Sequence, residues 1–291
     1  MSKRTLKVEK ERDIFLEWME RLGYAKDTLI GYRNSMNNLI YWCAKNGKRS
    51  LESLKKRDLV SFKRYLEEEK QKPNGEKISG GYVECNFNML KLYSNYLQNY
   101  GKAPLLLNDI KPTPFLESHR LPLTQEEIAS LYRETDNSLL GYRDRAILAL
   151  YYGCGLRRTE GLEVLVSDLD VKNDWLLVRK GKNGSQRKVP LSVKTKEHLA
   201  EYLIYSRPYL APEIPNLLVT YRGKKLNGGN LDLRIKKLGK LARIEKPVML
   251  HVLRHSIATH LLSSGMPLEY ISKFIGHSSL ESTQVYTHLT Q

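Results

Sequence analysis

The sequence predicts a mainly helical protein with one small β-hairpin or sheet, built as an N-terminal helical bundle followed by a mixed α+β domain. Three observations support this fold class. Apolar residues recur at helical spacing in the first third of the chain, prolines punctuate the stretch that follows, and two short strand-like runs later flank a glycine-containing turn. A chain of 291 residues that is 41% hydrophobic is large enough for two cores.

Four amphipathic helices are expected in the N-terminal part, over residues 8–23, 27–46, 58–71 and 79–100. Each has an apolar stripe, and we interpret the tyrosines and methionines in these stripes as core residues, because their spacing follows the helical period. The stripe of the first helix consists of Ile14, Phe15, Trp18, Met19 and Leu22, and that of the fourth of Tyr82, Phe87, Leu90, Tyr93, Tyr96 and Leu97.

A linker is predicted over residues 108–121, which contain Pro112 and Pro114. It divides the chain into a domain of residues 1–107 and a domain of residues 122–291.

The second domain is expected to open with a helix, since Thr124 and Glu127 have the spacing of a capping box. An apolar helix is expected from about Tyr142 to Tyr152. Strands over residues 175–179 and 186–191 should pair as a hairpin, and the remainder should be helical.

The charge of the chain points to a polyanionic partner. The net charge is +16 and the pI is about 9.6, and the excess is split about evenly, roughly +8 before residue 108 and roughly +8 after it. Charge alone leaves DNA, RNA, a membrane surface and simple solubility open. The three cysteines lack metal-type spacing, and no signal-like or 18-residue apolar segment occurs, so we expect a cytoplasmic protein.

Several residues suited to phosphate chemistry follow one another along the second domain. Arg157 comes after a Gly-x-Gly corner, with Glu160 three residues on, and His251 and Arg254 share a helical face. Lys182 lies in the hairpin turn, with Lys180 as a second candidate; His277 follows Gly276, and Tyr286 comes late in the chain.

Taken singly, these residues have ordinary alternatives. Arg157 suits the cap of its own turn, Lys182 a solvated turn, and His277 a helix cap, while Tyr286 is one of 18 tyrosines. His251 and His255 have zinc-like spacing, but they lack an intervening glutamate and an evident third ligand.

In this order, the residues resemble the tyrosine recombinases, or phage-integrase family, and within it the small Xer-type and transposon-borne members. The segments from Leu123 to Ile128 and from Gly141 to Leu148 add to the resemblance, which spans essentially residues 1–291 and is strongest from about residue 121 onwards.

The resemblance implies a helical, SAM-like core-binding domain and a C-terminal catalytic domain of the tyrosine recombinase type. It implies that Tyr286 attacks a DNA phosphate to give a 3′-phosphotyrosyl intermediate. Arg157 and Arg254 would neutralise the phosphoryl oxygens, Lys182 would protonate the leaving 5′ oxygen, and His251 and His277 would support the site. Glu160 would hold the Arg157 guanidinium.

The resemblance also implies double-stranded DNA as partner, recombination through a Holliday junction by four protomers, and no cofactor or metal. Only five residues follow Tyr286, where the family commonly has a further helix, so we expect a monomer in free solution. A type IB topoisomerase-like enzyme and a non-catalytic DNA-binding regulator on the same fold are the alternatives.

Overall fold

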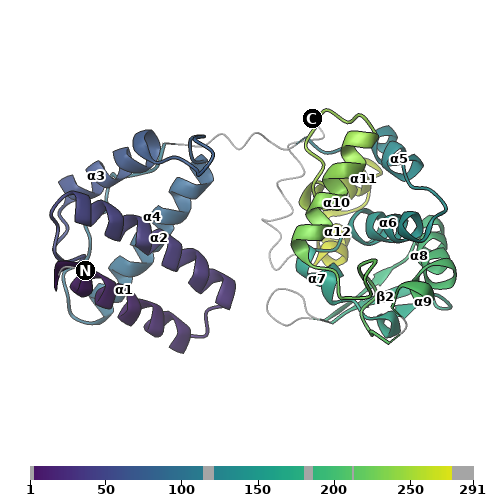
Figure 1. Ribbon diagram of the computed structural model, residues 1–291, viewed down its shortest axis with the longest axis horizontal. Helices are drawn as coiled ribbons and strands as arrows, with labels where there is room; N and C mark the ends of the chain where they lie inside the picture. Colours follow the sequence, from purple (N-terminus) through teal and green to yellow (C-terminus); the bar gives the residue numbers. More distant parts are fainter. Residues whose placement is uncertain (1–2, 114–120, 180–185, 212, 277–291) are drawn as a thin grey trace. The chain divides into compact units, whose positions relative to one another are not determined.

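The computed structural model describes residues 3–113, 121–179, 186–211 and 213–276, with side chains from residue 7 onwards. The chain divides into two compact units, Met1–Glu117 and Ser118–Gln291 (Figure 1). Each unit has its own hydrophobic core. The mainly helical fold class with a small sheet is confirmed.

The first unit contains the four predicted helices, α1 (Lys3–Arg21), α2 (Lys26–Lys45), α3 (Lys56–Arg64) and α4 (Gly80–Asn99). A π-helical turn, η1 (Tyr65–Glu69), prolongs α3. Helix α2 packs against both α1 and α4 (Figure 1).

The core of this unit is aromatic, as the apolar stripes predicted. Phe15 and Tyr93 are fully buried and meet edge to face, with ring centroids 5.1 Å apart. Two members of the predicted α1 stripe are exceptions, since Ile14 is 47% exposed and Leu22 is 57% exposed. The buried stripe of α1 is narrower than the sequence pattern suggested, because the neighbouring elements cover one side of the helix only.

The second unit begins with α5 (Gln125–Arg133) and α6 (Leu139–Leu148). The predicted capping box of α5 is present: the Thr124 backbone donates to Glu127 over 2.7 Å, and the Glu127 backbone donates to the Thr124 hydroxyl over 3.1 Å. Helix α6 continues into a π-helical turn, η2 (Ala149–Gly153). Residues 146–151 are all fully buried, so this segment forms the centre of the core.

The sheet has three antiparallel strands in the order β1 (Leu169–Asp170), β2 (Trp175–Val178) and β3 (Arg187–Pro190). Strands β2 and β3 form the predicted hairpin, in a register that pairs Val178 with Arg187. The two-residue strand β1 was not predicted from the sequence, because a segment this short has no periodicity to detect.

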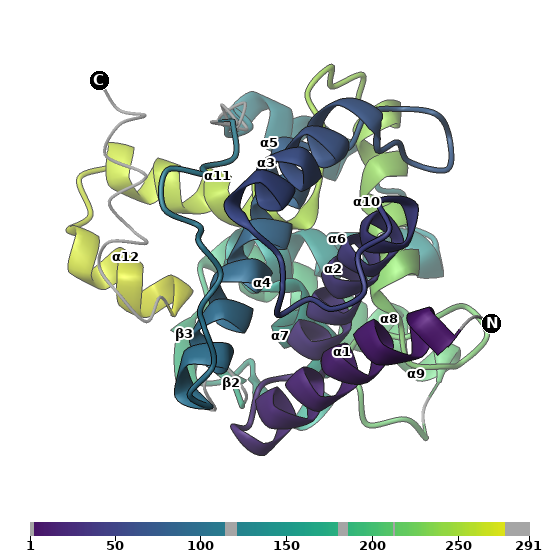
Figure 2. The ribbon, with the colours of Figure 1, turned by 90° about the vertical axis from the view of Figure 1, so that its left-hand side faces the viewer.

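The remaining elements are helical. They are α7 (Arg158–Glu163), the 3-10 turn η3 (Val166–Asp168), α8 (Val193–Tyr205), α9 (Arg207–Leu210), α10 (Gly228–Leu241), α11 (Leu250–Ser263) and α12 (Leu268–Ile275). Helix α12 folds back beside α11 (Figure 2). None of the helices in the described ranges is long and apolar enough to cross a membrane.

Candidate active site

A buried carboxylate, that of Glu160, lies at the centre of the candidate site. Glu160 is only 4% exposed and sits in the first turn of α7. An isolated buried carboxylate is costly, so it must be paired and hydrogen-bonded. Its partners come from the N-cap of α7, from strand β3 and from helix α11.

Arg157, the predicted first phosphate-binding arginine, caps the N-terminus of α7. Its backbone N–H donates to Glu160 Oε2 over 2.9 Å, and its Nη1 donates to Glu160 Oε1 over 2.7 Å. The predicted buttressing contact between Glu160 and Arg157 is therefore present. The side chain of Arg157 keeps 26% of its surface exposed, so part of the guanidinium can reach a ligand.

The chain reaches Arg157 through a tight corner at Gly155, where the backbone adopts φ +59°. A side chain is rarely accommodated in this left-handed region. A Cβ at Gly155 would also lie 3.3 Å from Ile275 and from Phe274. The corner therefore packs closely against the last turn of α12.

Arg254, the predicted second phosphate-binding arginine, comes from α11 and is 7% exposed. Its Nη1 donates to the Gly155 carbonyl over 2.6 Å and lies 3.8 Å from Glu160 Oε2. The structure thus brings Arg157 and Arg254 together around one carboxylate, although they are far apart in sequence.

Arg187 is a third arginine of this cluster, and the sequence had not indicated it as a site residue. It lies in β3, and its two terminal nitrogens donate to the two carboxylate oxygens of Glu160 over 3.0 and 2.9 Å. Such a paired geometry is the strong form of an arginine–carboxylate interaction. One signal was available: Arg187 is in phase with Val189, which is fully buried, so the strand pattern places this arginine on the inner face.

The last turn of α12 is bound by the same three arginines. A helix leaves its final carbonyls without intrahelical partners. Here Arg187 Nε donates to the Phe274 carbonyl over 3.1 Å, Arg254 Nη2 to Ile275 over 2.5 Å, and Arg157 Nη2 to Gly276 over 2.6 Å. Positive charge at a helix C-terminus also interacts favourably with the helix dipole.

The electrostatics of the cluster leave an excess of positive charge. Burial by itself raises the pKa of the Glu160 carboxyl, but hydrogen bonds from Arg187 and Arg157 outweigh burial and lower this pKa to about 2. Glu160 is therefore ionised at neutral pH and balances one of the three guanidinium charges. The remaining charge suits an anionic group such as a phosphodiester.

The other predicted site residues are placed differently. His251 lies on α11, one turn before Arg254, and its side chain is exposed. Lys182, His277 and Tyr286 lie outside the described residues, as does Lys180. Gly276, the last described residue, ends α12 in the left-handed conformation with φ +66°. Within the described ranges, no group of three or more His, Cys, Asp or Glu could hold a metal ion.

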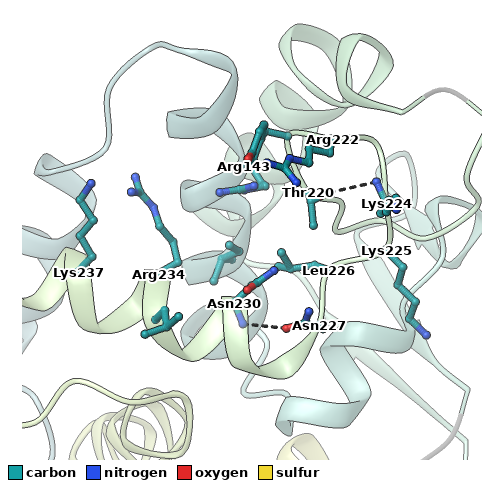
Figure 3. A pocket seen from close by; sticks show the side chains of 13 residues that line it. Arg143, Thr220, Arg222, Lys224, Lys225, Leu226, Asn227, Asn230, Arg234 and Lys237 are labelled. Atoms are coloured by element: carbon teal, nitrogen blue, oxygen red, sulfur yellow. Dashed lines mark hydrogen bonds between the residues drawn. The ribbon is translucent and has the colours of Figure 1, made fainter.

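A second positively charged surface lies beside α7, in a pocket of ≈ 610 Å³ between α6, the segment of residues 220–227 and α10 (Figure 3). Lys225 Nζ contacts Glu163 of α7 over 2.6 Å, and Arg158 of α7 contacts Asp232 of α10 over 3.2 Å. Six cationic side chains line the pocket: Arg143, Arg222, Lys224, Lys225, Arg234 and Lys237.

A helical domain with a small sheet, in which arginines from separate elements meet on one buried carboxylate, presents a preorganised positive site for an anionic group such as a phosphodiester. The chain belongs to the phage integrase family, whose model matches residues 122–291. Tyrosine recombinase XerC 2 of Ralstonia nicotianae is 31% identical over 92% of this chain and 78% of that protein. Tyrosine recombinase XerD of Vibrio cholerae is 30% identical over 94% of this chain and 88% of that protein.

Solved structures agree with the fold. The Tn1549 transposon integrase in complex with a circular intermediate DNA has a TM-score of 0.77 at 18% identity, over 95% of this chain and 94% of that chain. A lambda integrase dimer bound to a COC′ core site has a TM-score of 0.72 at 18% identity, over 94% of this chain and 96% of that chain.

The protein is thus a tyrosine recombinase, an enzyme of site-specific DNA recombination that cleaves and religates DNA. The topoisomerase-like and the regulatory alternatives are not favoured.

Proposed function

We propose that this recombinase cleaves DNA with Tyr286 as nucleophile and Arg157 and Arg254 as the ligands of the scissile phosphate. The observation that carries the proposal is the convergence of both arginines on Glu160, which fixes two guanidinium groups before DNA binds. Preorganised donors of this kind stabilise the charge that develops on the phosphoryl oxygens during transfer.

In the proposed step the Tyr286 hydroxyl passes its proton to His251 as its oxygen bonds to phosphorus. The bond from phosphorus to the 5′ oxygen breaks, and the 3′ end remains on Tyr286 as a phosphotyrosine. Lys182 gives a proton to the departing 5′ oxygen, and His251 and His277 support the phosphate through proton transfer or hydrogen bonding. The energy of the broken bond is kept in the phosphotyrosine, so the free 5′ hydroxyl of a partner strand can reverse the step without a cofactor.

We propose that residues 1–107 form the DNA-binding core domain, that residues 108–121 are the linker and that residues 122–291 catalyse the reaction. Both halves carry an excess of positive charge, and six cationic side chains line the pocket beside α7. Arg143, Arg234 and Lys225 pair with carboxylates, whereas Arg222, Lys224 and Lys237 suit contacts with the phosphate backbone. Four protomers would act together on a Holliday junction; a lambda integrase tetramer bound to such a junction is among the similar structures. Action in the cytoplasm stays a prediction from the cysteine pattern.

Substitution of Tyr286 by Phe tests the nucleophile directly. A duplex that binds the wild-type protein is selected from a random-sequence pool, and copies of it are nicked at successive positions to trap the cleaved state. The wild-type protein should give a covalent adduct on a denaturing gel. Tyr286→Phe should give none, while its DNA affinity stays within about threefold, because the charge contacts to the backbone are unchanged. A persistent adduct would show that another tyrosine is the nucleophile.

A further inference from the structure

Arg187 points into the candidate active site from strand β3, and each of its three guanidinium nitrogens already has a hydrogen-bond partner. All three of its nitrogens donate hydrogen bonds, two to Glu160 and one to the Phe274 carbonyl, over 2.9 to 3.1 Å. These contacts tie Arg187 to Glu160 and to the end of α12. Arg187 is therefore well placed to hold the groups that would bind a phosphate.

The contacts of Arg187 connect three elements that the chain order separates. The carboxylate belongs to α7, the guanidinium to β3, and the Phe274 carbonyl to the last turn of α12. Each Glu160 oxygen receives one bond from Arg187 and one from Arg157. Removing Arg187 would leave a buried carboxylate with half of its donors, and the carboxylate would then be able to pull the Arg157 guanidinium inward.

The end of α12 is shaped to admit this guanidinium. A Cβ on Gly276 would lie 2.7 Å from Arg187 Nη1 and 2.9 Å from its Cζ, so no larger residue fits without displacing Arg187. Gly276 in turn accepts from Arg157 through its carbonyl. Arg187 and Arg157 are thus fixed by the same carboxylate on one side and by the Phe274 and Gly276 carbonyls of the same helix end on the other.

We propose that Arg187 is a positioning residue of the cleavage step. It acts through Glu160, which sets the orientation of the Arg157 guanidinium toward the scissile phosphate. The inference rests on the proposed function, in which Arg157 binds that phosphate.

A double-mutant cycle in single-turnover cleavage tests this role, with the nicked duplex as substrate and the full chain as enzyme. The variants are Arg187→Gln, Arg157→Ala and both together. Arg187→Gln should bind the duplex within about threefold of wild type and cleave it about 10- to 100-fold more slowly, the usual scale for groups that orient a reacting residue. In the Arg157→Ala background, the further loss should be under about threefold, because the group through which Arg187 acts is gone.

Arg145 provides a matched control. Its side chain is 15% exposed, and it also bonds a carboxylate and a backbone carbonyl, those of Glu201 and Asp136, over 3.1 and 2.8 Å. It lies on α6, and its hydrogen bonds go to Glu201 and to residues 135–137, outside the Glu160 cluster. Arg145→Gln should lower the unfolding temperature about as much as Arg187→Gln and leave the cleavage rate within about threefold of wild type.

The inference fails if the losses from Arg187→Gln and Arg157→Ala multiply in the double variant, or if Arg145→Gln slows cleavage as much as Arg187→Gln. Should Arg187→Gln not fold, Arg187→Lys enters the same cycle; it keeps the charge but cannot make the paired contact. A wild-type protein that forms no adduct would refute the proposed function, whereas an adduct formed at the wild-type rate by Arg187→Gln would refute only the role of Arg187.

Discussion

Arg157 and Arg254 both contact Glu160 but differ in the exposed fraction of their side chains. Arg254 is nearly buried between the Gly155 and Ile275 carbonyls, while Arg157 keeps about a quarter of its side chain exposed. Arg254 therefore forms the floor of the site, and Arg157 presents the exposed part of its guanidinium to the DNA.

Loss of either arginine should slow cleavage strongly. We expect Arg157→Ala or Arg254→Ala to reduce the single-turnover rate about 100-fold or more, the scale for losing one preorganised donor. Arg157→Lys should recover only part of the rate, because an ammonium group cannot reproduce the guanidinium fork. Addition of EDTA should leave the wild-type rate unchanged, since the arginines supply the positive charge. A rate that depends on a divalent metal would contradict this mechanism.

The depressed pKa of Glu160 predicts a pH dependence of stability. Its folded-state pKa is about 2, below the ordinary value of 4.5, so ionised Glu160 stabilises the folded protein. That contribution is complete above about pH 4.5 and is lost as the pH falls toward 2. Glu160→Gln should therefore lower the free energy of unfolding by about 3 kcal/mol at pH 7.

Urea denaturation at several pH values measures this effect, and the difference between wild type and Glu160→Gln should shrink between pH 4.5 and 2. Glu163→Gln is the control on the same helix. Its carboxylate is 59% exposed and pairs with Lys225, so its loss should change stability by less than about 1 kcal/mol. A pH-independent difference between wild type and Glu160→Gln would contradict the assignment.

At the scale of elements, the short helix α7 is held in place by close packing on η2. Tyr151 is fully buried, and its hydroxyl donates to the Arg158 carbonyl over 3.0 Å. A Cβ on Gly161 would lie 2.5 Å from the end of the Tyr151 ring. The start of α7, and with it Arg157, is thus located by a tyrosine that is itself fully buried.

Gly161→Ala should therefore act on both stability and cleavage. Overpacking against Tyr151 should cost about 1–3 kcal/mol and displace α7, which slows cleavage. Gly31→Ala, in the exposed face of α2 with no atom within 4 Å of the new Cβ, should instead stabilise its unit by about 0.5–1 kcal/mol. Hydrogen exchange in urea, which resolves the two units, measures both changes. An unchanged α7 in Gly161→Ala would show that the contact relaxes without cost.

At the scale of the whole molecule, the net charge bears on self-association. A net charge of +16 spread over both units opposes association of free protomers, and DNA phosphates remove that repulsion.

We accordingly predict a monomer in free solution and assembly of four protomers on DNA. Sedimentation of the DNA-free protein at micromolar concentration should give the mass of one chain, 33.7 kDa. Addition of the selected duplex should shift the protein to larger species, and more so at low salt. A stable dimer or tetramer without DNA would mean that a surface contact outweighs the charge repulsion.

The sequence by itself determined those elements and contacts that depend on residues close together in the chain. Helical spacing located α1 to α4 and the core position of Tyr93, and the Thr124 capping box marked the start of α5, because both signals depend on residues a turn apart. The pairing of Arg157 with Glu160 follows the same rule. The order of Arg, Lys, His and Tyr residues then indicated the family.

Tertiary structure decided the rest, because contacts between distant segments leave no periodic trace in the sequence. The paired contact of Arg187 with Glu160 and the capping of α12 by three arginines depend on β3, α7, α11 and α12 meeting at one point. The exposure of Ile14 likewise depends on which side of α1 its neighbours cover. The spacing of residues along the chain determines the secondary structure of a segment. The packing of the elements determines which arginines contact the buried carboxylate of Glu160.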